Sequence, residues 1–152
     1  MIAVTFRPTA TPDARPGDYL PRLGQLLDAP VRTGADLANL ALDRLQVGVI
    51  DRLSAQGLKW DELSFIIARR TLTHRREKHE LLTADESDKA IRLARLVAQA
   101  ETVFGEQARA MQWLRNPQRR FDGKTALDMA STEHGARLVE DALTQIDEGY
   151  FA

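Results

Sequence analysis

Residues 68–96 read ARRTLTHRREKHELLTADESDKAIRLARL, and two different patterns meet within them. The first part, residues 69–80, is rich in basic side chains and has only Leu72 as a clearly apolar residue, so little of it can be buried. The second part opens with Thr83 and Glu86, whose spacing is that of a capping box at the start of a helix. The stretch therefore predicts a short basic helix followed by a long capped helix.

The long helix that follows Thr83 ends at Gly105, a residue type that commonly terminates helices. Its apolar side chains recur at helical spacing: Ile91, Ala94, Val97, Ala98 and Phe104. Before the basic helix, residues 59–68 (KWDELSFIIA) predict another short segment with its apolar residues on one side. These residues are Leu63, Ile66 and Ile67.

Farther upstream, Asp36 is a suitable cap for one helix that continues to Leu53 and stops at Gly57. The apolar residues of this helix are Leu37, Leu40, Ala41, Leu45, Val49 and Leu53. Residues 1–34 differ because several prolines interrupt them, and proline removes backbone donors and fixes φ. We expect these residues to form an extended, poorly ordered arm. Its prolines include Pro8, Pro12, Pro16 and Pro21.

Three more helices are predicted downstream. Residues 106–116 form a helix that Pro117 ends. Thr125 and Asp128 then cap a short helix that Gly135 breaks, which leaves His134 in a loop. The last helix carries apolar residues before Gly149 closes it: Leu138, Val139, Ala142, Leu143 and Ile146. Because no strand-like alternation appears, the sequence predicts an all-α fold, a small helical bundle.

Composition excludes several classes of chemistry. The 152 residues contain no cysteine and three histidines without metal-ligand spacing, which argues against thiolate chemistry and a metal site. No paired carboxylates, nucleophile–base pair or glycine-rich phosphate loop is found, so we expect neither an enzyme nor a cofactor. No apolar run is long enough to cross a membrane and no signal pattern is present, so a cytoplasmic protein is expected.

The charge distribution points to a polyanionic partner for the middle of the chain. The net charge is −1, yet residues 69–100 contain eight basic and five acidic side chains. A basic helix after a short apolar one suits a reader of the DNA major groove, in which Arg and Lys contact phosphates and Thr, His and Arg contact bases. The alternative is a solvated charged face. The candidate DNA-binding residues are Arg69, Arg70, Thr71, Thr73, His74, Arg75, Arg76 and Lys78.

Residues 61–96 resemble the Xre-type helix-turn-helix of the Xre/MbcA/ParS antitoxin family. The resemblance lies in a Thr-Leu pair in the second helix and a Glu-Ser pair at the start of the long helix. The matching residues are Thr71, Leu72, Glu86 and Ser87. The chain departs from the family at Ile66 and Ala68, where the turn usually offers a glycine and a serine cap.

The C-terminal third is similar to the toxin-binding domain of the same family, over spaced positions that stay in register. They are Phe104, Gly105, Trp113, Leu114, Pro117, Gly123, Thr125, Leu127, Thr132, Gly135, Val139, Leu143, Ile146, Gly149 and Tyr150. Ala126 departs, since the family usually has proline there. Several of the matched residues are expected in the core: Trp113, Leu114, Leu127, Val139 and Ile146. The expected organisation is an arm (1–34), a helix-turn-helix domain (35–100) and a toxin-binding domain (101–152).

Tyr150 and Phe151 follow the glycine that closes the last helix, so they either fold back onto the bundle or wait for a partner, and the residues alone leave both open. The resemblance implies that the partner is a RES-domain toxin that degrades NAD, inhibited when the antitoxin's C-terminus enters its active site. The implied toxin-binding residues are Glu148, Gly149, Tyr150, Phe151 and Ala152. Nearby acidic groups would face a basic rim around that cleft: Glu140, Asp141, Asp147 and Glu148.

The sequence thus predicts an antitoxin that blocks its toxin sterically and represses its own operon. Operators of such proteins are usually inverted repeats, so a homodimer is expected. One alternative is a stand-alone helix-turn-helix regulator whose C-terminal domain only dimerises. Another is an adaptor that keeps the C-terminal interface and binds no DNA.

Overall fold

The computed structural model describes residues 18–149. These residues form α-helices, one 3₁₀-helix (η1) and a single isolated bridge between Gln46 and Leu81. The elements are α1 (Leu20–Leu27), α2 (Gly34–Asp43), α3 (Gly48–Ala55), α4 (Trp60–Leu63), α5 (Arg69–Lys78), α6 (Ala84–Phe104), α7 (Gln107–Arg115), η1 (Arg119–Phe121), α8 (Ala126–Met129) and α9 (Glu133–Asp147). The all-α prediction is confirmed.

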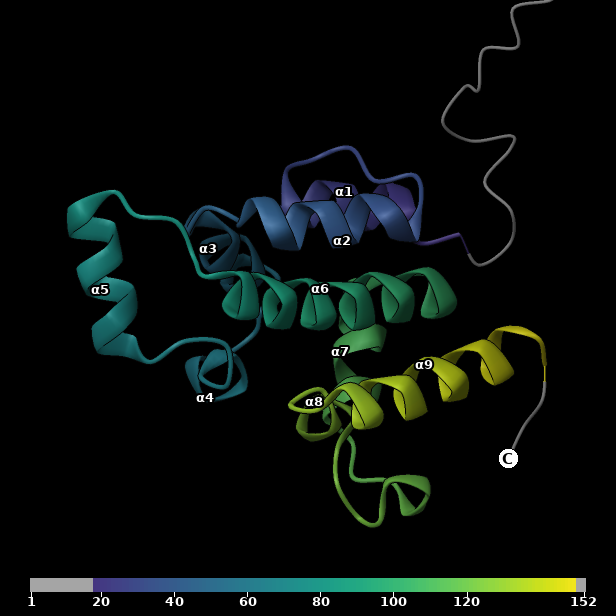
Figure 1. Cartoon of the computed structure of the whole chain (residues 1–152). Coiled ribbons are helices and arrows are strands. Elements are labelled where there is room, and N and C mark those ends of the chain that lie inside the picture. The colour runs from purple at the N-terminus through teal and green to yellow at the C-terminus, as the bar shows by residue number, and fades with distance from the viewer. Residues whose placement is uncertain (1–17, 150–152) are drawn as a thin grey trace, which may run out of the picture.

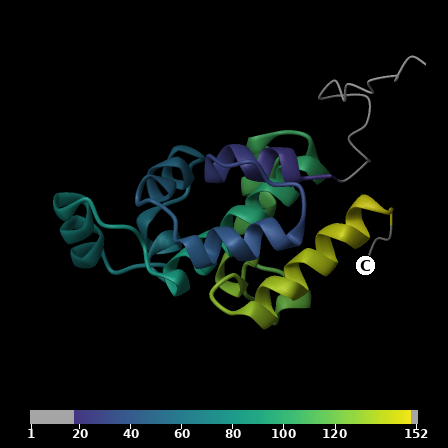
Figure 2. The same ribbon diagram turned by 45° about the horizontal axis from the view of Figure 1, so that its top comes forward.

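The 21-residue helix α6 forms the centre of the bundle. Helices α1 and α2 pack on one side of it, and α7 and α9 pack on another (Figures 1 and 2). Because neighbours cover it on several sides, α6 buries far more than a single stripe, and many of its buried residues are alanines that let the other helices approach closely. Its buried apolar residues are Ala90, Ile91, Leu93, Ala94, Leu96, Val97, Ala98 and Ala100.

The helix ends that are predicted from the spacing of nearby residues are confirmed. Thr83 and Glu86 form a reciprocal capping box, and Thr125 and Asp128 form another at the start of α8. Gly105 ends α6 in the left-handed conformation, with φ +80°. Each of these motifs satisfies helix-terminal groups within a few residues of the chain, so each can be identified from sequence alone.

The prediction of an extended arm over residues 1–34 is wrong for the part that forms α1. Pro21 lies at the first turn of this helix, where proline is tolerated because the N–H it lacks would be unpaired anyway. Leu23, Leu26 and Leu27 lie on the buried face at helical spacing. The Arg52 guanidinium of α3 also donates hydrogen bonds to the carbonyls of Leu26 and Leu27, at 2.8 and 3.2 Å, and so satisfies the helix end.

The single helix predicted from Asp36 to Leu53 is in fact two helices, α2 and α3. Arg44 interrupts it with φ +70°, and the N–H of Leu45 donates to the buried hydroxyl of Ser87 at 2.8 Å. The Leu45 carbonyl accepts from the N–H of Leu82 at 2.9 Å. These contacts tie the break to the start of α6, and they replace the helical hydrogen bonds that the break removes. The cap of α2 is Thr33, with Asp36 as its capping-box partner.

The prediction that Gly135 breaks the chain between two helices is wrong. Gly135 lies in the first turn of α9, and its N–H donates to the hydroxyl of the cap residue Thr132 at 2.9 Å. A Cβ at this position would lie 2.1 Å from the carbonyl oxygen of Met129. The glycine is therefore required for the close approach of α8 and α9, and His134 is helical as well.

The boundary predicted between residues 100 and 101 lies inside α6, so the two expected units share this helix. α2 packs on α6 from the helix-turn-helix side, whereas α7 and α9 pack on it from the C-terminal side. The division into units remains a prediction. Within residues 18–149, no helix is long and apolar enough to span a membrane.

Candidate nucleic-acid interface and C-terminal surface

The basic helix α5 stands at one end of the molecule, away from the central helix α6 (Figure 1). It begins after Ala68, which is extended, and ends at His79 in the left-handed conformation, with φ +53°. Leu72 is its buried residue, with a 5% exposed fraction. Burying one leucine contributes about 1.5–3 kcal/mol, so additional contacts must orient the helix.

Three of the predicted DNA-binding arginines supply those contacts, because they flank Leu72 on the inner side. Arg69 lies over the ring of Trp60 in α4, 4.8 Å from its centroid. Arg75 pairs with Glu86 of α6 and donates to the Leu81 carbonyl at 3.2 Å. The third, Arg76, pairs with Asp51 of α3. These arginines attach α5 to three neighbouring helices, a role that the sequence analysis did not foresee.

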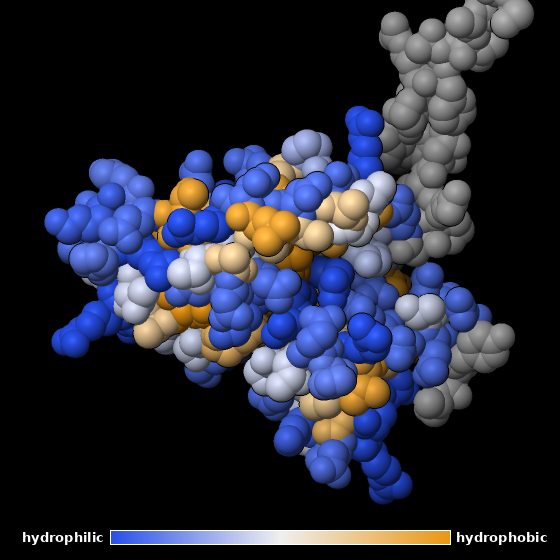
Figure 3. Space-filling model, in the orientation of Figure 1, coloured by the Kyte–Doolittle hydropathy of each residue, from blue (hydrophilic) through white to orange (hydrophobic). Residues whose placement is uncertain are grey.

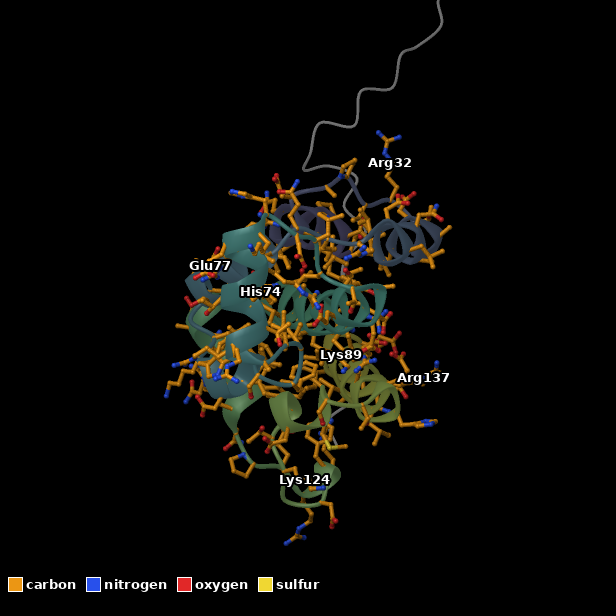
Figure 4. The ribbon with its side chains drawn as sticks, turned by 60° about the vertical axis from the view of Figure 1, so that its left-hand side comes forward. Arg32, His74, Glu77, Lys89, Lys124 and Arg137 are labelled. Carbon is orange, nitrogen blue, oxygen red and sulfur yellow. The ribbon has the colours of Figure 1, made fainter. Side chains whose placement is uncertain are left out.

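The remaining predicted residues lie on the other sides of α5. With about 100° of rotation per residue, Arg70, His74 and Lys78 lie on the side of α5 opposite Leu72, and Thr71 and Thr73 lie at the two edges of that side. Thr71 is half-buried and the other four are exposed. Glu77 shares this face with His74, as Figure 4 shows for both side chains. We call these five predicted residues the outer face of α5.

The outer face combines the groups that a DNA reader uses. Arg70 and Lys78 lie two turns apart and can contact phosphates, whereas His74 between them can donate to or accept from a base edge. The Thr73 hydroxyl donates to the Arg69 carbonyl at 3.1 Å and keeps its capacity to accept. Because few apolar groups are present, this face is suited to a polar, charged partner.

The described part of the C-terminal surface ends where α9 ends. The N–H of Glu148 donates to the Thr144 carbonyl at 3.0 Å, and Gly149 follows with φ +83°. Both residues are exposed, and a glycine in this conformation turns the chain away from the helix axis. The other predicted binding residues, Tyr150, Phe151 and Ala152, lie outside the described residues.

The acidic groups predicted to face a partner fall into two sets. Glu140 is half-buried and pairs with Arg95 of α6, so its carboxylate stabilises the packing of α9 on α6 and is not free for a partner. That part of the prediction is wrong. Asp141, Asp147 and Glu148 are exposed on the other sides of α9. The separation reflects the turn of the helix, which sends adjacent residues to different neighbours.

The expected core residues are mostly confirmed, since Leu114, Leu127 and Val139 are buried, whereas Ile146 and Trp113 are half-buried. Trp113 forms an aromatic cluster with two partners: its ring centroid lies 5.7 Å from that of Phe104 and 6.1 Å from that of Phe121. Leu138, predicted on the apolar stripe of α9, is instead 51% exposed. The helical period alone does not predict this exposure, because it depends on how far the neighbouring α6 covers the face of α9.

An ion pair joins α4 of the helix-turn-helix to α7 of the C-terminal side. Arg115 donates to both carboxylate oxygens of Glu62, at 2.9 and 2.7 Å, and to the Gly57 carbonyl at 2.6 Å. Burial alone would raise the pKa of Glu62, but the hydrogen bonds from Arg115 and from the Lys59 N–H outweigh it and lower that pKa. The Glu62 carboxylate in turn raises the pKa of Arg115.

Among residues 18–149, no three His, Asp or Glu side chains are grouped in a way that could hold a metal ion. The polar cleft between α4 and α8 has a volume of about 360 Å³ and is lined by Asp61, Phe65, Thr125, Asp128 and Ser131 in addition to the Glu62–Arg115 pair.

Comparisons with known proteins match both parts of the chain. The family model for the antitoxin Xre-like helix-turn-helix domain matches residues 26–95, and that for the antitoxin Xre/MbcA/ParS C-terminal toxin-binding domain matches residues 99–149. The chain is 38% identical over 135 residues to Antitoxin Xre of Pseudomonas putida, covering 88% of this chain and 85% of that protein. It is 28% identical over 106 residues to the Prs ADP-ribosylating antitoxin of a Sphingobium species, covering 64% and 65%.

Proposed function

Because this chain belongs to the Xre antitoxin family, with a helix-turn-helix and a toxin-binding domain, we propose that it neutralises a RES-domain toxin and represses its own operon. The main observation behind the proposal is that the basic residues of α5 have two different roles. Arg69, Arg75 and Arg76 hold the helix in place, while the outer face is left to contact a polyanion. A charged helix whose basic residues do not separate into packing residues and exposed residues is more often simply solvated.

Operator binding uses the outer face of α5 in the major groove. Arg70 and Lys78 contact phosphates and position the helix, and His74 and Thr73 read base edges. Arg75 and Arg76 hold α5 on the bundle through Glu86 and Asp51 and do not contact bases. Since operators of this kind are inverted repeats, the DNA-bound form is a homodimer whose two α5 helices enter successive major grooves.

Toxin neutralisation uses residues 148–152 as a plug. Gly149 directs the chain off α9, and Tyr150 and Phe151 enter the active-site cleft of the toxin. Aromatic anchors in a pocket that excludes water contribute most to binding. Inhibition by occlusion needs no catalytic group on this chain.

The proposal that the toxin consumes NAD is supported by the name of the Sphingobium relative, which links that antitoxin to ADP-ribosylation. ADP-ribosylation uses NAD as the donor of the ADP-ribosyl group. Two outcomes of the toxin reaction, hydrolysis of NAD and transfer of ADP-ribose to a protein, share that substrate. Both would require a cleft for an anionic dinucleotide.

The test first asks whether the gene beside this one encodes a RES-domain protein. If it does, that protein is purified and NAD consumption is measured with and without the antitoxin. We expect the full chain to stop NAD loss at a stoichiometric ratio and a chain lacking residues 150–152 to leave the toxin active. A truncated chain that protects NAD as well as the full one would contradict the plug. The alternative of a stand-alone regulator predicts unaltered NAD consumption together with normal binding to the promoter fragment.

A further inference from the structure

A cleft opens beside the C-terminal end of α6, and we call it the aromatic cleft. Its volume is about 490 Å³, and its lining combines two aromatic rings with three polar side chains: Phe104, Trp113, Arg109, Gln112 and Asn116. The two rings are half-buried, their centroids lie 5.7 Å apart, and they are tilted by 38°. Partly exposed aromatic surface bordered by a few polar groups suits another aromatic ring that has a polar end.

The C-terminal end of α9 lies close to this cleft, because α9 packs parallel to α6. Two ion pairs join the helices at earlier residues of each, and farther along both the Gln99 amide donates to the Thr144 hydroxyl at 3.3 Å. Phe104 and Gly149 follow these two residues by the same number of positions. Since packed helices lie about 8–10 Å apart, the end of α9 comes beside the end of α6. Figure 1 shows both ends on the same side of the molecule.

The cap of α9 favours a return of the chain toward the aromatic cluster. The Gly149 N–H donates to a carbonyl of the last turn at 3.1 Å, and Gly149 has φ +83°. After a glycine cap of this kind, the next residue commonly packs against the last turn of the helix. Gln145 in that turn lines one groove with Phe121 of η1, whose ring contacts that of Trp113 edge-on with centroids 6.1 Å apart. The cluster that forms the wall of the cleft therefore extends to the end of α9.

We propose that the side chain of Tyr150 occupies the aromatic cleft in the free antitoxin, and that the toxin has to displace it before residues 148–152 can act as a plug. Tyr150 directly follows Gly149, so it is the first side chain that can reach the cleft. The antitoxin thus covers its own inhibitory residue until the toxin competes for it. This inference rests on the proposed function and adds a regulation of the same residues.

The side chains around the cleft match a tyrosine. Its ring lies against the rings of Phe104 and Trp113. Arg109 is 70% exposed and only loosely paired with Glu106, at 3.7 Å, so its guanidinium is free to cover the ring as a cation–π partner. The amides that border the cleft can donate to and accept from a phenolic hydroxyl. They belong to Gln112 and Asn116.

Other surfaces near the end of α9 suit the tyrosine less well. Figure 3 shows a face that is mostly hydrophilic, with its apolar groups in small separate patches. The large apolar side chain that α9 itself exposes is Leu138. With a rise of about 1.5 Å per residue, it lies about 16 Å from Gly149 along the helix, which is too far for the next residue.

Self-docking sets how readily the toxin is captured. Only the molecules whose plug is released can bind, and the apparent Kd is the intrinsic Kd divided by that fraction. If about nine molecules in ten hold Tyr150 in the cleft, the apparent Kd for the toxin rises about tenfold. Docking also covers aromatic surface that would otherwise attract unrelated proteins.

The first experiment needs no toxin and uses the fluorescence of the cleft itself. Trp60→Phe leaves Trp113 as the only tryptophan of the full chain. In this background, we expect Tyr150→Ala to increase the acrylamide quenching of Trp113 and to shift its emission to longer wavelength. Leu138→Ala is the matched control, since it removes an exposed side chain from α9, and it should change neither quantity. Equal quenching with and without the Tyr150 side chain overturns the proposal.

The second experiment traps the docked state, which is possible because the chain contains no cysteine. Phe151→Cys keeps Tyr150 and is combined with Gln112→Cys at the cleft. In the control, Leu42→Cys on α2 replaces Gln112→Cys. We expect an intramolecular disulfide in the first double variant and none in the control, because a disulfide requires Cα atoms within about 7 Å. Oxidation should abolish inhibition of the RES-domain protein by the first variant, and reduction should restore it.

The outcomes separate this inference from the proposed function. An unprotected Trp113 in a chain that still stops NAD consumption overturns self-docking and leaves the plug standing. An oxidised chain that inhibits as well as the reduced one also overturns self-docking. Protection of Trp113 that is lost on dilution overturns docking within one chain, because a second copy then supplies the tyrosine. Failure of the wild-type chain to inhibit the RES-domain protein overturns the proposed function and this inference together.

Discussion

The guanidinium of Arg115 in α7 donates two hydrogen bonds to the carboxylate of Glu62 in α4, at 2.9 and 2.7 Å. This pair connects residues 53 positions apart, one on the helix-turn-helix and the other on the toxin-binding side. Glu62 also caps α4 by accepting from the Lys59 N–H at 2.8 Å. The Glu62 carboxylate therefore both caps α4 and links the helix-turn-helix to the toxin-binding side.

The first prediction concerns the pH dependence of this pair. Because the pKa of Glu62 is lower in the folded state than its ordinary value of 4.5, its charge stabilises the fold fully above about pH 4.5, and this contribution is lost as the pH falls through the folded-state pKa. Glu62→Gln keeps an oxygen for the cap and removes the charge. We expect it to lower the free energy of unfolding at pH 7 by about 1 kcal/mol or less, and we expect this difference to shrink as the pH falls from 4.5 to 3.

Urea unfolding of both chains at the two pH values tests this prediction. Asp61→Asn is the control, because that neighbouring carboxylate is exposed and makes no hydrogen bond with Arg115 among the described contacts. A stability difference for Glu62→Gln that is as large at pH 3 as at pH 7 would show that the charge is not its cause.

The second prediction concerns the close approach of α8 and α9. Gly135→Ala places a Cβ 2.1 Å from the Met129 carbonyl, and backbone has to move to relieve the clash. We expect a loss of about 3 kcal/mol or more in the free energy of unfolding. Gly34→Ala in α2 is the matched control, since a Cβ there meets nothing within 4 Å, and it should leave stability unchanged or raise it slightly. Denaturant midpoints compare the two variants, and equal midpoints would contradict the prediction.

The elements that the sequence predicts well are those whose causes are local. The caps formed by Thr83 with Glu86 and by Thr125 with Asp128 join residues three apart, so their spacing is visible in the sequence. Leu72 is predicted as the anchor of α5 because it has no apolar competitor in that helix. The helical conformation of these segments is predicted from the same nearby residues.

The errors arise where distant residues decide the structure. The break between α2 and α3 depends on Ser87, 42 positions from Leu45, and the partner of Arg75 is Glu86 of another helix. Leu138 fits the apolar stripe of α9 by period, yet it lies at the edge of the face that α6 covers. One distinction was available and missed. Counting about 100° per residue from Leu72 separates the inner arginines of α5 from its outer face.

The third prediction tests the outer face of α5 against the promoter fragment of the operon. Arg70→Ala and Lys78→Ala should each weaken binding and reduce the slope of log K against log salt by about 0.9, the value for one lost phosphate contact. Glu77→Ala is the control on the same face, and removing its negative charge should strengthen binding or leave it unchanged. Salt titrations by fluorescence anisotropy give the slopes. If neither slope changes, this face does not contact the DNA backbone.

The fourth prediction separates the inner arginines from the outer ones. Arg75 is largely buried, with its side chain 14% exposed, and it pairs with the residue that caps α6. Arg75→Ala leaves Glu86 without its partner, so we expect a lower melting temperature together with weaker DNA binding. Arg70→Ala should weaken DNA binding at an unchanged melting temperature. Calorimetry of both variants would contradict the assignment if their melting temperatures fell equally.

The last prediction follows from the placement of the two surfaces. In both views of the ribbon, α5 lies at one end of the molecule and the end of α9 lies at the other (Figures 1 and 2). A toxin held at α9 therefore leaves the outer face of α5 open, and we expect the antitoxin–toxin complex to bind the promoter fragment. Removal of residues 150–152 should reduce recruitment of the toxin to DNA without changing the DNA affinity of the antitoxin alone. Surface plasmon resonance on immobilised promoter DNA, with antitoxin injected before toxin, measures both steps. Release of the antitoxin by toxin would contradict this geometry, because it would require the two surfaces to overlap or to be coupled through the pair Glu62–Arg115.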